Sequence, residues 1–293
     1  TICVTAEWIF TPPAPAAPPP ARVRRRPIQV PLTTQALIIR ENNNIGEADR
    51  FVTALTRDLG VVRASARGAQ RMKSRNASAT PLLSYSRLSL IKGREKYIIE
   101  SAAPLRVFFE LRSDIELTTL AQYFCELAGV LAPREEPAED FLRLLLNALH
   151  FLGAEPGKRI PALQVKAVVE LRLMTMTGYM PDLSGCAGCG AGTGPTAQPI
   201  PLYFQPQEGV LYCAECLRMR SNRESALSPA LQAGPALLAA MRHIAYSPLE
   251  RCFFFSLGAD SLRALSSVTE AFLLAQLNRG FNTLDFYHTL TEY

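Results

Sequence analysis

The sequence predicts an α+β protein in which a five-stranded OB-type β-barrel precedes an α-helical domain carrying a four-cysteine zinc ribbon. Three observations predict this architecture. Five strand-like runs lie between Leu32 and Ser101, the hydrophobic period becomes helical from Pro104, and two C-x-x-C pairs begin at Cys186 and Cys213. We expect a disordered Pro/Arg-rich tail at 1–31, an OB-fold nucleic-acid-binding domain at 32–103, and a helical domain at 104–293 with the zinc ribbon inserted at about 183–218.

The tail contains TPPAPAAPPPARVRRRP, a low-complexity stretch that cannot bury enough surface to offset its ordering entropy. Strand-like runs follow at 35–40, 51–57, 61–67, 82–91 and 96–101. Five short strands in this length are typical of a small closed barrel. The third and fourth runs are separated by Gly68 to Thr80, a loop long enough to suggest a function of its own.

Positive charge is concentrated in the barrel region. The 293 residues carry a net charge of only +5, yet Arg57 to Lys96 contains ten Lys or Arg residues against two acids. The stretch VVRASARGAQRMKSR (61–75) raises alternate arginines on one strand face and continues into a basic loop. This pattern predicts a phosphate-binding surface, although a solvated edge strand has the same pattern. The candidate phosphate-binding residues are Arg63, Arg67, Arg71, Lys73, Arg75, Arg87, Lys92, Arg94 and Lys96.

Helical periodicity dominates the chain after Pro104. Apolar residues recur at three- and four-residue steps over 115–131, 140–152 and 160–177, and again at 229–246 and 261–278. No apolar run reaches the length of a membrane span, and no secretory signal is evident, so we expect a cytoplasmic protein without a membrane partner.

The four paired cysteines have the spacing of a metal site. Two C-x-x-C turns, Cys186–Cys189 and Cys213–Cys216, can aim four thiolates at one ion, and YFQPQEGVLY (203–212) predicts the hairpin that delivers the second pair. Four thiolates leave no open coordination position, so we expect one structural Zn²⁺. The remaining cysteines, Cys3, Cys125 and Cys252, are expected in the tail or core.

No motif proposes a catalytic centre. The chain lacks a phosphate-binding loop, a G-x-S-x-G element and a carboxylate pair at metal-ligand spacing. His150, His243 and His288 stand in helical or terminal contexts, where a structural role is expected. We therefore predict that no residue is catalytic and that the protein is not an enzyme.

Specific segments resemble the RecO family of bacterial recombination mediators. They are QALIIRE (35–41), EADRFVTALTRDLG (47–60), ARGAQRMKSR (66–75), GREKYIIESA (93–102), LRSDIELTTLAQYFCEL (111–127) and GYMPDLSGCAGCG (178–190). The resemblance covers Thr34 to about Leu290. The combination of the basic element with G-Y-x-P-x-L-x-x-C-x-x-C makes it specific.

This resemblance implies a DNA repair protein of the RecF pathway, acting at the nucleoid. It implies binding of single- and double-stranded DNA, annealing of complementary strands, and help in loading RecA onto DNA coated with single-strand-binding protein. The resemblance implies DNA contacts at Arg67, Arg71, Lys73 and Arg75, which match its basic element. To these we add further candidate DNA-binding residues from charge and strand phase: Arg63, Arg87, Lys92, Arg94 and Lys96. The resemblance also implies RecR and the C-terminal tail of single-strand-binding protein as partners, with RecA engaged indirectly. The tail pocket is expected in the helical domain. One possible groove is flanked by Lys158, Arg159, Lys166 and Arg172, which otherwise form a solvated helix face.

Three other functions stay open at this point. A zinc-ribbon OB-fold RNA-binding factor would also use a barrel and a basic loop. A zinc-dependent nucleic-acid enzyme would need an open metal position. An adaptor would use the basic face to bind an acidic protein.

Overall fold

The computed structural model describes residues 30–42, 49–66, 69, 76–155, 157, 159–192, 200–221 and 229–291. The chain divides into Thr1–Val30 and Pro31–Tyr293, and the architecture below is that of the second unit. The expected tail therefore lies outside the described residues, except for Val30 and Pro31.

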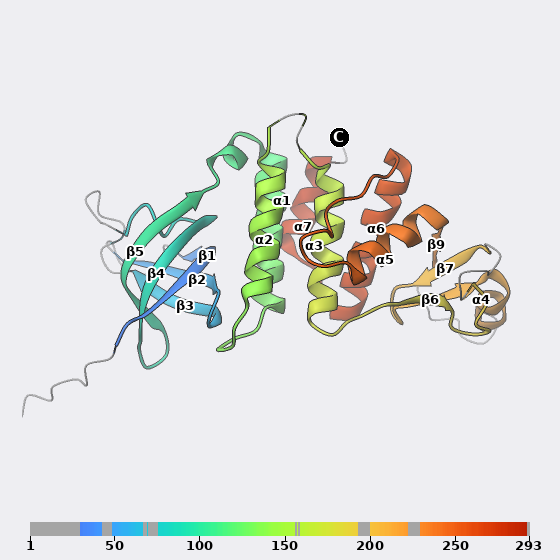
Figure 1. Ribbon diagram of the computed structural model, residues 1–293, viewed down its shortest axis with the longest axis horizontal. Helices are drawn as coiled ribbons and strands as arrows, with labels where there is room; N and C mark the ends of the chain where they lie inside the picture. The colour runs from blue at the N-terminus through green and yellow to red at the C-terminus, as the bar shows by residue number, and fades with distance from the viewer. Residues whose placement is uncertain are drawn as a thin grey trace, which may run out of the picture. The chain divides into compact units, whose positions relative to one another are not determined.

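The N-terminal part of the described chain is a closed five-stranded barrel, as predicted (Figure 1). Its strands are β1 (Leu32–Asn42), β2 (Arg50–Thr56), β3 (Gly60–Ala66), β4 (Ser84–Lys92) and β5 (Tyr97–Val107), in the order β1-β2-β3-β5-β4. All pairings are antiparallel except β3 with β5. Alternate residues fill the barrel interior with small and branched side chains, including Ala36, Ile38, Ala54, Val62, Ala64 and Leu88.

The fifth strand is longer than its sequence pattern predicts. The predicted strand-like run ends at Ser101, but β5 continues to Val107 because it stays paired with β4 as far as Ser84. A short 3-10 helix (Phe109–Ser113) follows, and α1 (Ile115–Leu131) begins after Asp114, whose side chain accepts a hydrogen bond of 3.1 Å from the Leu117 N–H.

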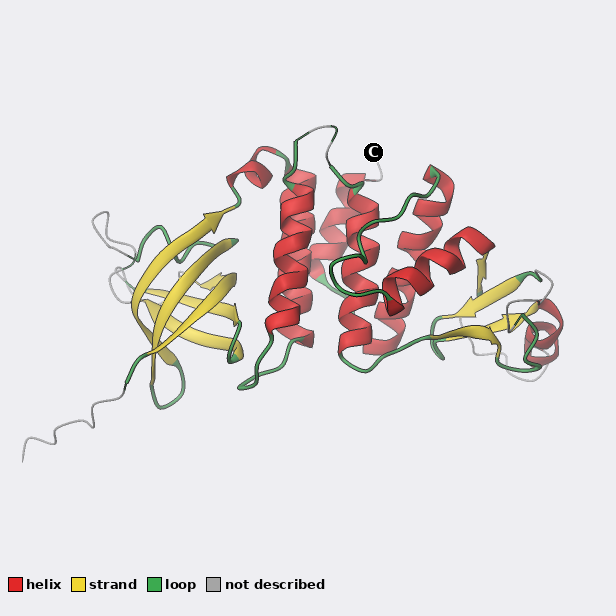
Figure 2. Cartoon of the chain, in the orientation of Figure 1, coloured by secondary structure: helices red, strands yellow, loops and turns green. Residues whose placement is uncertain are grey.

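The helical part is built around α3. It comprises α1, α2 (Glu139–Leu152), α3 (Ala162–Met176), α5 (Pro235–Tyr246), α6 (Ala259–Leu277) and α7 (Asn282–Thr291). Helix α3 packs against α1, α2, α5 and α6, and α7 packs against α1 (Figure 2). Because α3 has neighbours on all sides, its residues are buried around nearly the whole circumference. None of the helices in the described ranges is long and apolar enough to cross a membrane.

The cysteine pairs belong to a small sheet module at one end of the helical part. Strands β6 (Asp182–Cys186), β7 (Leu202–Gln205), β8 (Val210–Cys213) and β9 (Leu231–Ala233) have the order β6-β8-β7-β9, and α4 (Ala214–Ser221) follows β8 directly. Strands β7 and β8 form the predicted hairpin.

A close backbone contact joins the barrel to the helices. The Val61 N–H donates to the Pro133 carbonyl at 2.8 Å, and the Glu135 N–H donates to the Leu59 carbonyl at 3.0 Å. Gly60, with φ of +61°, lies so close to Pro133 that a β-carbon would overlap its carbonyl oxygen. Leu55 and Val61 of the barrel consequently belong to the same apolar core as the helices.

A buried ionic cluster crosses the helical core. The Lys166 ammonium lies 2.8 Å from Glu170 and 2.6 Å from Glu270, and Lys166 is only 1% exposed. The Tyr123 hydroxyl donates to Glu170 at 2.9 Å, and the Thr269 hydroxyl does so at 2.7 Å. Burial alone would lower the pKa of Lys166, but the two carboxylates raise it above its usual value, so the side chain is an ammonium.

We predict that Gly60→Ala destabilises the protein by about 1–3 kcal/mol more than Gly178→Ala does. Both glycines have positive φ, but a β-carbon at Gly178 would meet no atom within 4 Å. The difference therefore isolates the steric cost of the Pro133 contact. Urea unfolding of both variants measures it, and equal midpoints would contradict the prediction.

We predict that Lys166→Met lowers the free energy of unfolding by about 3–5 kcal/mol, because it leaves the Glu170 carboxylate buried without its cation. The double variant Lys166→Met/Glu170→Gln should recover part of this loss. Arg263→Met is the matched control, since it removes an exposed ion pair with Asp260 and should cost less than about 1 kcal/mol. Urea unfolding measures the free energy of unfolding of all three variants. Equal losses in Lys166→Met and Arg263→Met would exclude a penalty for an unpaired buried charge.

Candidate nucleic-acid interface and metal centre

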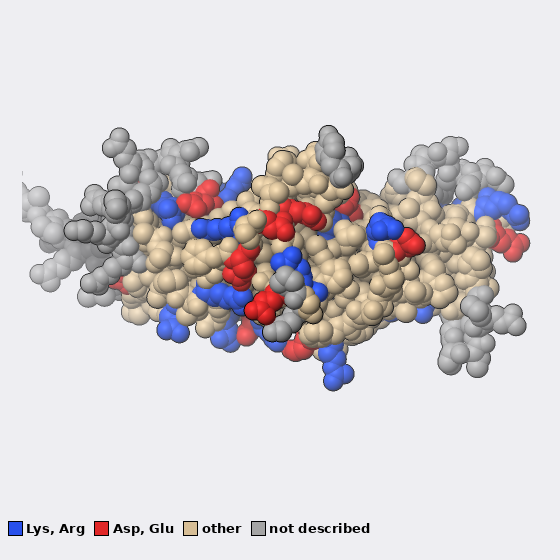
Figure 3. Space-filling model, turned by 90° about the horizontal axis from the view of Figure 1, so that it is seen from above, with Lys and Arg blue, Asp and Glu red and all other residues tan. Residues whose placement is uncertain are grey.

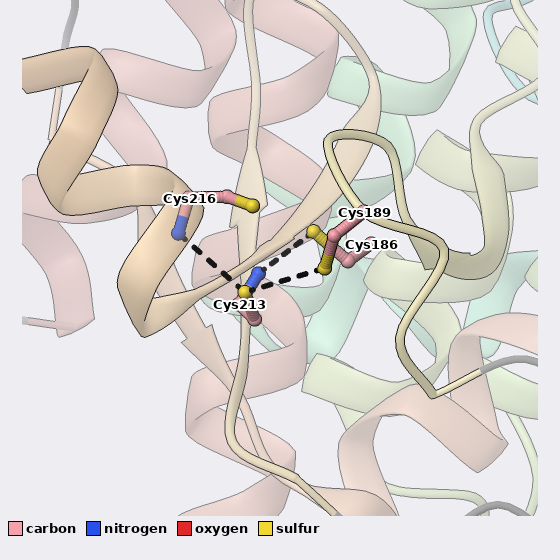
Figure 4. Close-up of side chains that lie close together, drawn as sticks. All are labelled: Cys186, Cys189, Cys213 and Cys216. Carbon is pink, nitrogen blue, oxygen red and sulfur yellow. Dashed lines mark hydrogen bonds between the residues drawn. The ribbon is translucent and has the colours of Figure 1, made fainter.

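The four paired cysteines converge on one point (Figure 4). Their Sγ atoms all lie within 4.8 Å of one another, and those of Cys189 and Cys213 are 3.8 Å apart. A tetrahedral site with metal–sulfur bonds of about 2.3 Å separates its sulfurs by roughly 3.8 Å. The cluster therefore has the dimensions to hold one metal ion.

Local backbone structure sets these positions. Cys186 ends β6 and Cys213 ends β8, while Cys189 lies in the turn after β6 and Cys216 lies in the first turn of α4. The Cys213 N–H donates to the Cys186 sulfur at 3.2 Å. A β-carbon at Gly188 would lie 2.8 Å from the Cys216 sulfur, so the turn requires glycine there.

The thiols differ in acidity. Burial would raise the pKa of Cys186, but N–H groups of Cys213, Cys189 and Gly188 lower it to about 6. The pKa of Cys216 is instead raised, first by its hydrogen bond with Cys213 and then by burial. Four adjacent thiols cannot all ionise without a compensating cation, and a bound divalent metal would supply that charge. The donor set thus fits a thiophilic cation in a closed site.

The remaining described cysteines are core residues, as predicted. Cys125 and Cys252 are buried, and burial raises the pKa of the first to about 12 and that of the second to about 11. Cys3 lies outside the described residues.

Each of the three histidines has a side-chain or backbone partner. His150 lies 3.2 Å from the Arg106 guanidinium, His243 lies 2.9 Å from the Arg251 carbonyl, and His288 lies 3.0 Å from Glu270.

The predicted DNA-binding residues fall into two sets. Arg67, Arg71, Lys73 and Arg75 lie outside the described residues. The other five are all exposed on the barrel: Arg63, Arg87, Lys92, Arg94 and Lys96. These five remain predicted contacts.

The structure brings only some of the five together. Arg63 and Lys96 line one groove, and Lys96 and Arg94 line a smaller hollow beside it. The Lys96 ammonium also stacks 3.9 Å from the centre of the Phe51 ring. Arg87 stands elsewhere on the barrel, between its β1 partner Gln35 and its β5 partner Ala103, while Lys92 pairs with Glu135 at 3.5 Å.

The groove lies between the outer face of β1–β3 and the helices α1 and α7, and has a volume of about 1130 Å³. Three of its arginines were not predicted as site residues: Arg40, Arg134 and Arg279. They are far apart in the sequence, so charge density along the chain does not group them. Only the juxtaposition of barrel and helices does.

The groove expected beside α3 is not present in the predicted form. Lys166 is buried in the ionic cluster, and the Arg172 guanidinium donates to the carbonyls of Ile244 and Ala245 at 3.0 and 2.8 Å. Both side chains point into the fold because α3 is central, so the solvated-face alternative is wrong as well. Arg159 is exposed, and Lys158 lies outside the described residues.

Charge on the surface is mixed. On the face drawn in Figure 3, Lys and Arg side chains are interspersed with Asp and Glu and form no continuous basic field. Local pairing therefore decides which cations can contact a ligand.

Two family models match the chain. "Recombination protein O N terminal" matches residues 30–108, and "Recombination protein O C terminal" matches residues 112–285.

Proteins named DNA repair protein RecO are similar over most of their length. The protein from Acetivibrio thermocellus is 32% identical over 259 residues, which cover 88% of this chain and 97% of the relative. The protein from Symbiobacterium thermophilum is 32% identical over 84% of this chain and 93% of its own. Both halves of the sequence thus match in the order the fold shows, and the chain belongs to the RecO family of DNA repair proteins.

Proposed function

We propose that this protein is a non-enzymatic recombination mediator. In this proposal it binds single- and double-stranded DNA, anneals complementary strands, and helps load RecA onto DNA coated with single-strand-binding protein. The observation that carries the proposal is the match of both halves of the chain to the RecO family, on a closed barrel that exposes a set of cations.

The chemistry of the barrel surface suits annealing. Lysine and arginine that contact phosphates lower the repulsion between two backbones, carry no sequence preference and leave the bases free to pair. Arg63, Arg94 and Lys96 are exposed, and the basic element 66–75 continues from the end of β3. Tyr85 and Tyr97 are half-buried and pack against the two apolar cores, so their first role is packing; stacking of bases on the exposed part of either ring is a secondary element of the proposal.

The proposed protein partners are RecR and the C-terminal tail of single-strand-binding protein, with RecA engaged indirectly at the bacterial nucleoid. Membership of the family supports these partners. We propose zinc as the metal of the four-cysteine site, because four thiolates at tetrahedral spacing suit Zn²⁺ and leave no position for water. Its role is then to cross-link β6, β8 and α4.

Strand annealing tests the function. Without nucleotide, the protein should accelerate pairing of complementary oligonucleotides coated with cognate single-strand-binding protein. Replacing Arg71, Lys73 and Arg75 by alanine should slow annealing. It should also flatten the slope of the logarithm of the DNA association constant against the logarithm of the salt concentration by up to about three, since each lost phosphate contact removes roughly 0.9. The matched control replaces three exposed cations of the helical half, Arg112, Arg218 and Arg263.

An unchanged salt slope in the loop variant would remove the loop from the binding surface. DNA binding without acceleration would reject the mediator function and leave the fold assignments intact. A clear preference for single-stranded RNA over DNA would favour the alternative, a zinc-ribbon OB-fold RNA-binding factor.

Metal analysis tests the cysteine site. The purified protein should contain one zinc per chain by mass spectrometry of the metal, and Cys186→Ser should lose most of it. Chelation should release the metal and melt the β6–β9 module, because ligand binding and local folding are coupled. Cys252→Ala is the control, since this cysteine is buried outside the cluster. Full zinc retention by Cys186→Ser would contradict the assignment.

A further inference from the structure

The groove between barrel and helices has an excess of positive charge that its ion pairs do not cancel. Five cations line it: Arg40, Arg63, Lys96, Arg134 and Arg279. Four acids also line it: Glu41, Glu95, Glu126 and Glu135. The partners of these groups decide which charges remain available.

Two of the four acids form ion pairs with cations. Glu41 pairs with Arg50 at 2.9 Å, and Glu135 pairs with Lys92, so each is neutralised by a cation outside the groove lining. Glu126 accepts a hydrogen bond of 2.6 Å from the Thr283 hydroxyl, but a neutral hydroxyl does not cancel the charge of a carboxylate. Five cations therefore stand against two carboxylates, Glu95 and Glu126, that form no ion pair within the described ranges.

The arginines of the groove differ from Glu41 and Glu135 in their ion pairing. Across the described ranges, none of the four arginines in the groove forms an ion pair with a carboxylate, and all four are exposed.

Two of the arginines form a row on the barrel wall. Thr53 of β2 is the direct partner of Arg40 on β1 and of Arg63 on β3, so the three residues lie side by side on the outer face. Two strand spacings separate the arginines by about 10 Å. The register of β1 shifts between Ile38 and Arg40, and this irregularity lets Arg40 face outward although the neighbouring Ile39 packs into the helical core.

The other two arginines are fixed on the helical wall. Arg134 forms an isolated β-bridge with Gly60, directly after the Pro133 carbonyl that accepts from Val61. Arg279 precedes α7, and its guanidinium lies 4.8 Å from the centre of the buried Phe281 ring. Both positions are therefore held by the packing that joins barrel and helices.

The lining favours a polyphosphate over a peptide. Its apolar members Ile39, Val61 and Val62 are buried, whereas Val130 is exposed and Leu82 is half-buried, so the four exposed arginines are what distinguish this lining from an apolar peptide groove. Guanidinium groups bind phosphate oxygens bidentately. The half-buried Tyr97 adds a ring on which an unpaired base can stack.

We infer that this groove binds the phosphate backbone of a single-stranded nucleic acid. The strand then crosses from Arg40 and Arg63 on the barrel to Arg134 and Arg279 on the helical wall. This inference rests on the proposed function and names a path for the strand beyond the basic loop.

Anisotropy titrations of the full-length protein with a fluorescent oligo-dT test the inference. Arg134→Gln/Arg279→Gln should reduce the salt slope by about 1.4, since each single-strand contact contributes roughly 0.7, and should weaken binding at about 50 mM salt by at least about tenfold. Arg112→Gln/Arg263→Gln is the control, because neither of these exposed arginines lines the groove.

A second pair of variants keeps all four arginines. Thr53→Glu places a negative charge between Arg40 and Arg63 and should weaken binding by about tenfold or more. Thr53→Gln introduces a side chain of nearly the same shape as glutamate without the charge, and should leave the affinity unchanged. Urea midpoints of the two variants confirm that both are folded.

The outcomes separate the groove from the proposed function. In one outcome, the wild type binds the oligonucleotide with the expected salt dependence while Arg134→Gln/Arg279→Gln and Thr53→Glu keep its affinity and salt slope. That result would overturn the groove as a binding site and leave the proposed function standing. Absence of oligonucleotide binding by the wild type would overturn both. Polyglutamate binding that depends on Arg134 would then identify an acidic protein as the ligand.

Discussion

The arrangement of the barrel depends on one backbone contact, the approach of the β2–β3 turn to the segment that joins α1 to α2. Gly60 has no room for a side chain against Pro133, and hydrogen bonds from Val61 and Glu135 fix the contact on either side. Because of this contact, one face of the barrel packs against the helices. Leu55 and Val61 enter the helical core, and the rest of that face becomes a wall of the groove.

The two cores have different characters. The barrel interior is small and is filled by alanine together with valine, leucine and isoleucine. The larger core includes the outward-facing apolar residues of the barrel together with the helices, so the barrel gains apolar burial from its neighbour as well as from its own interior. The exposed cations of the barrel cost little folding free energy, because their charged ends remain in water. The cysteine module is a small unit, and a metal cross-link suits a module of this size.

Much of the fold follows from sequence periodicity. Strand-like runs bounded by turn residues located all five strands, and the paired cysteines located the cysteine cluster, because both signals are local. The pattern fails at β5, where pairing with β4 extends the strand to Val107. It also fails at α3. Lys166 and Arg172 suggest a solvated face, but a helix surrounded by others has to bury its charges, and it pairs Lys166 with Glu170 and Glu270.

The sequence by itself determined the order of barrel, helices and cysteine module, the four cysteines that cluster, and the basic character of the barrel segment. Each of these depends on residue types within a few positions of one another. Only the tertiary structure decided which cations share a surface. Arg40, Arg134 and Arg279 are separated by most of the chain and meet only because the Gly60 contact sets the barrel against α1 and α7. Charge along a sequence identifies a basic segment, but only packing brings distant charges to one groove.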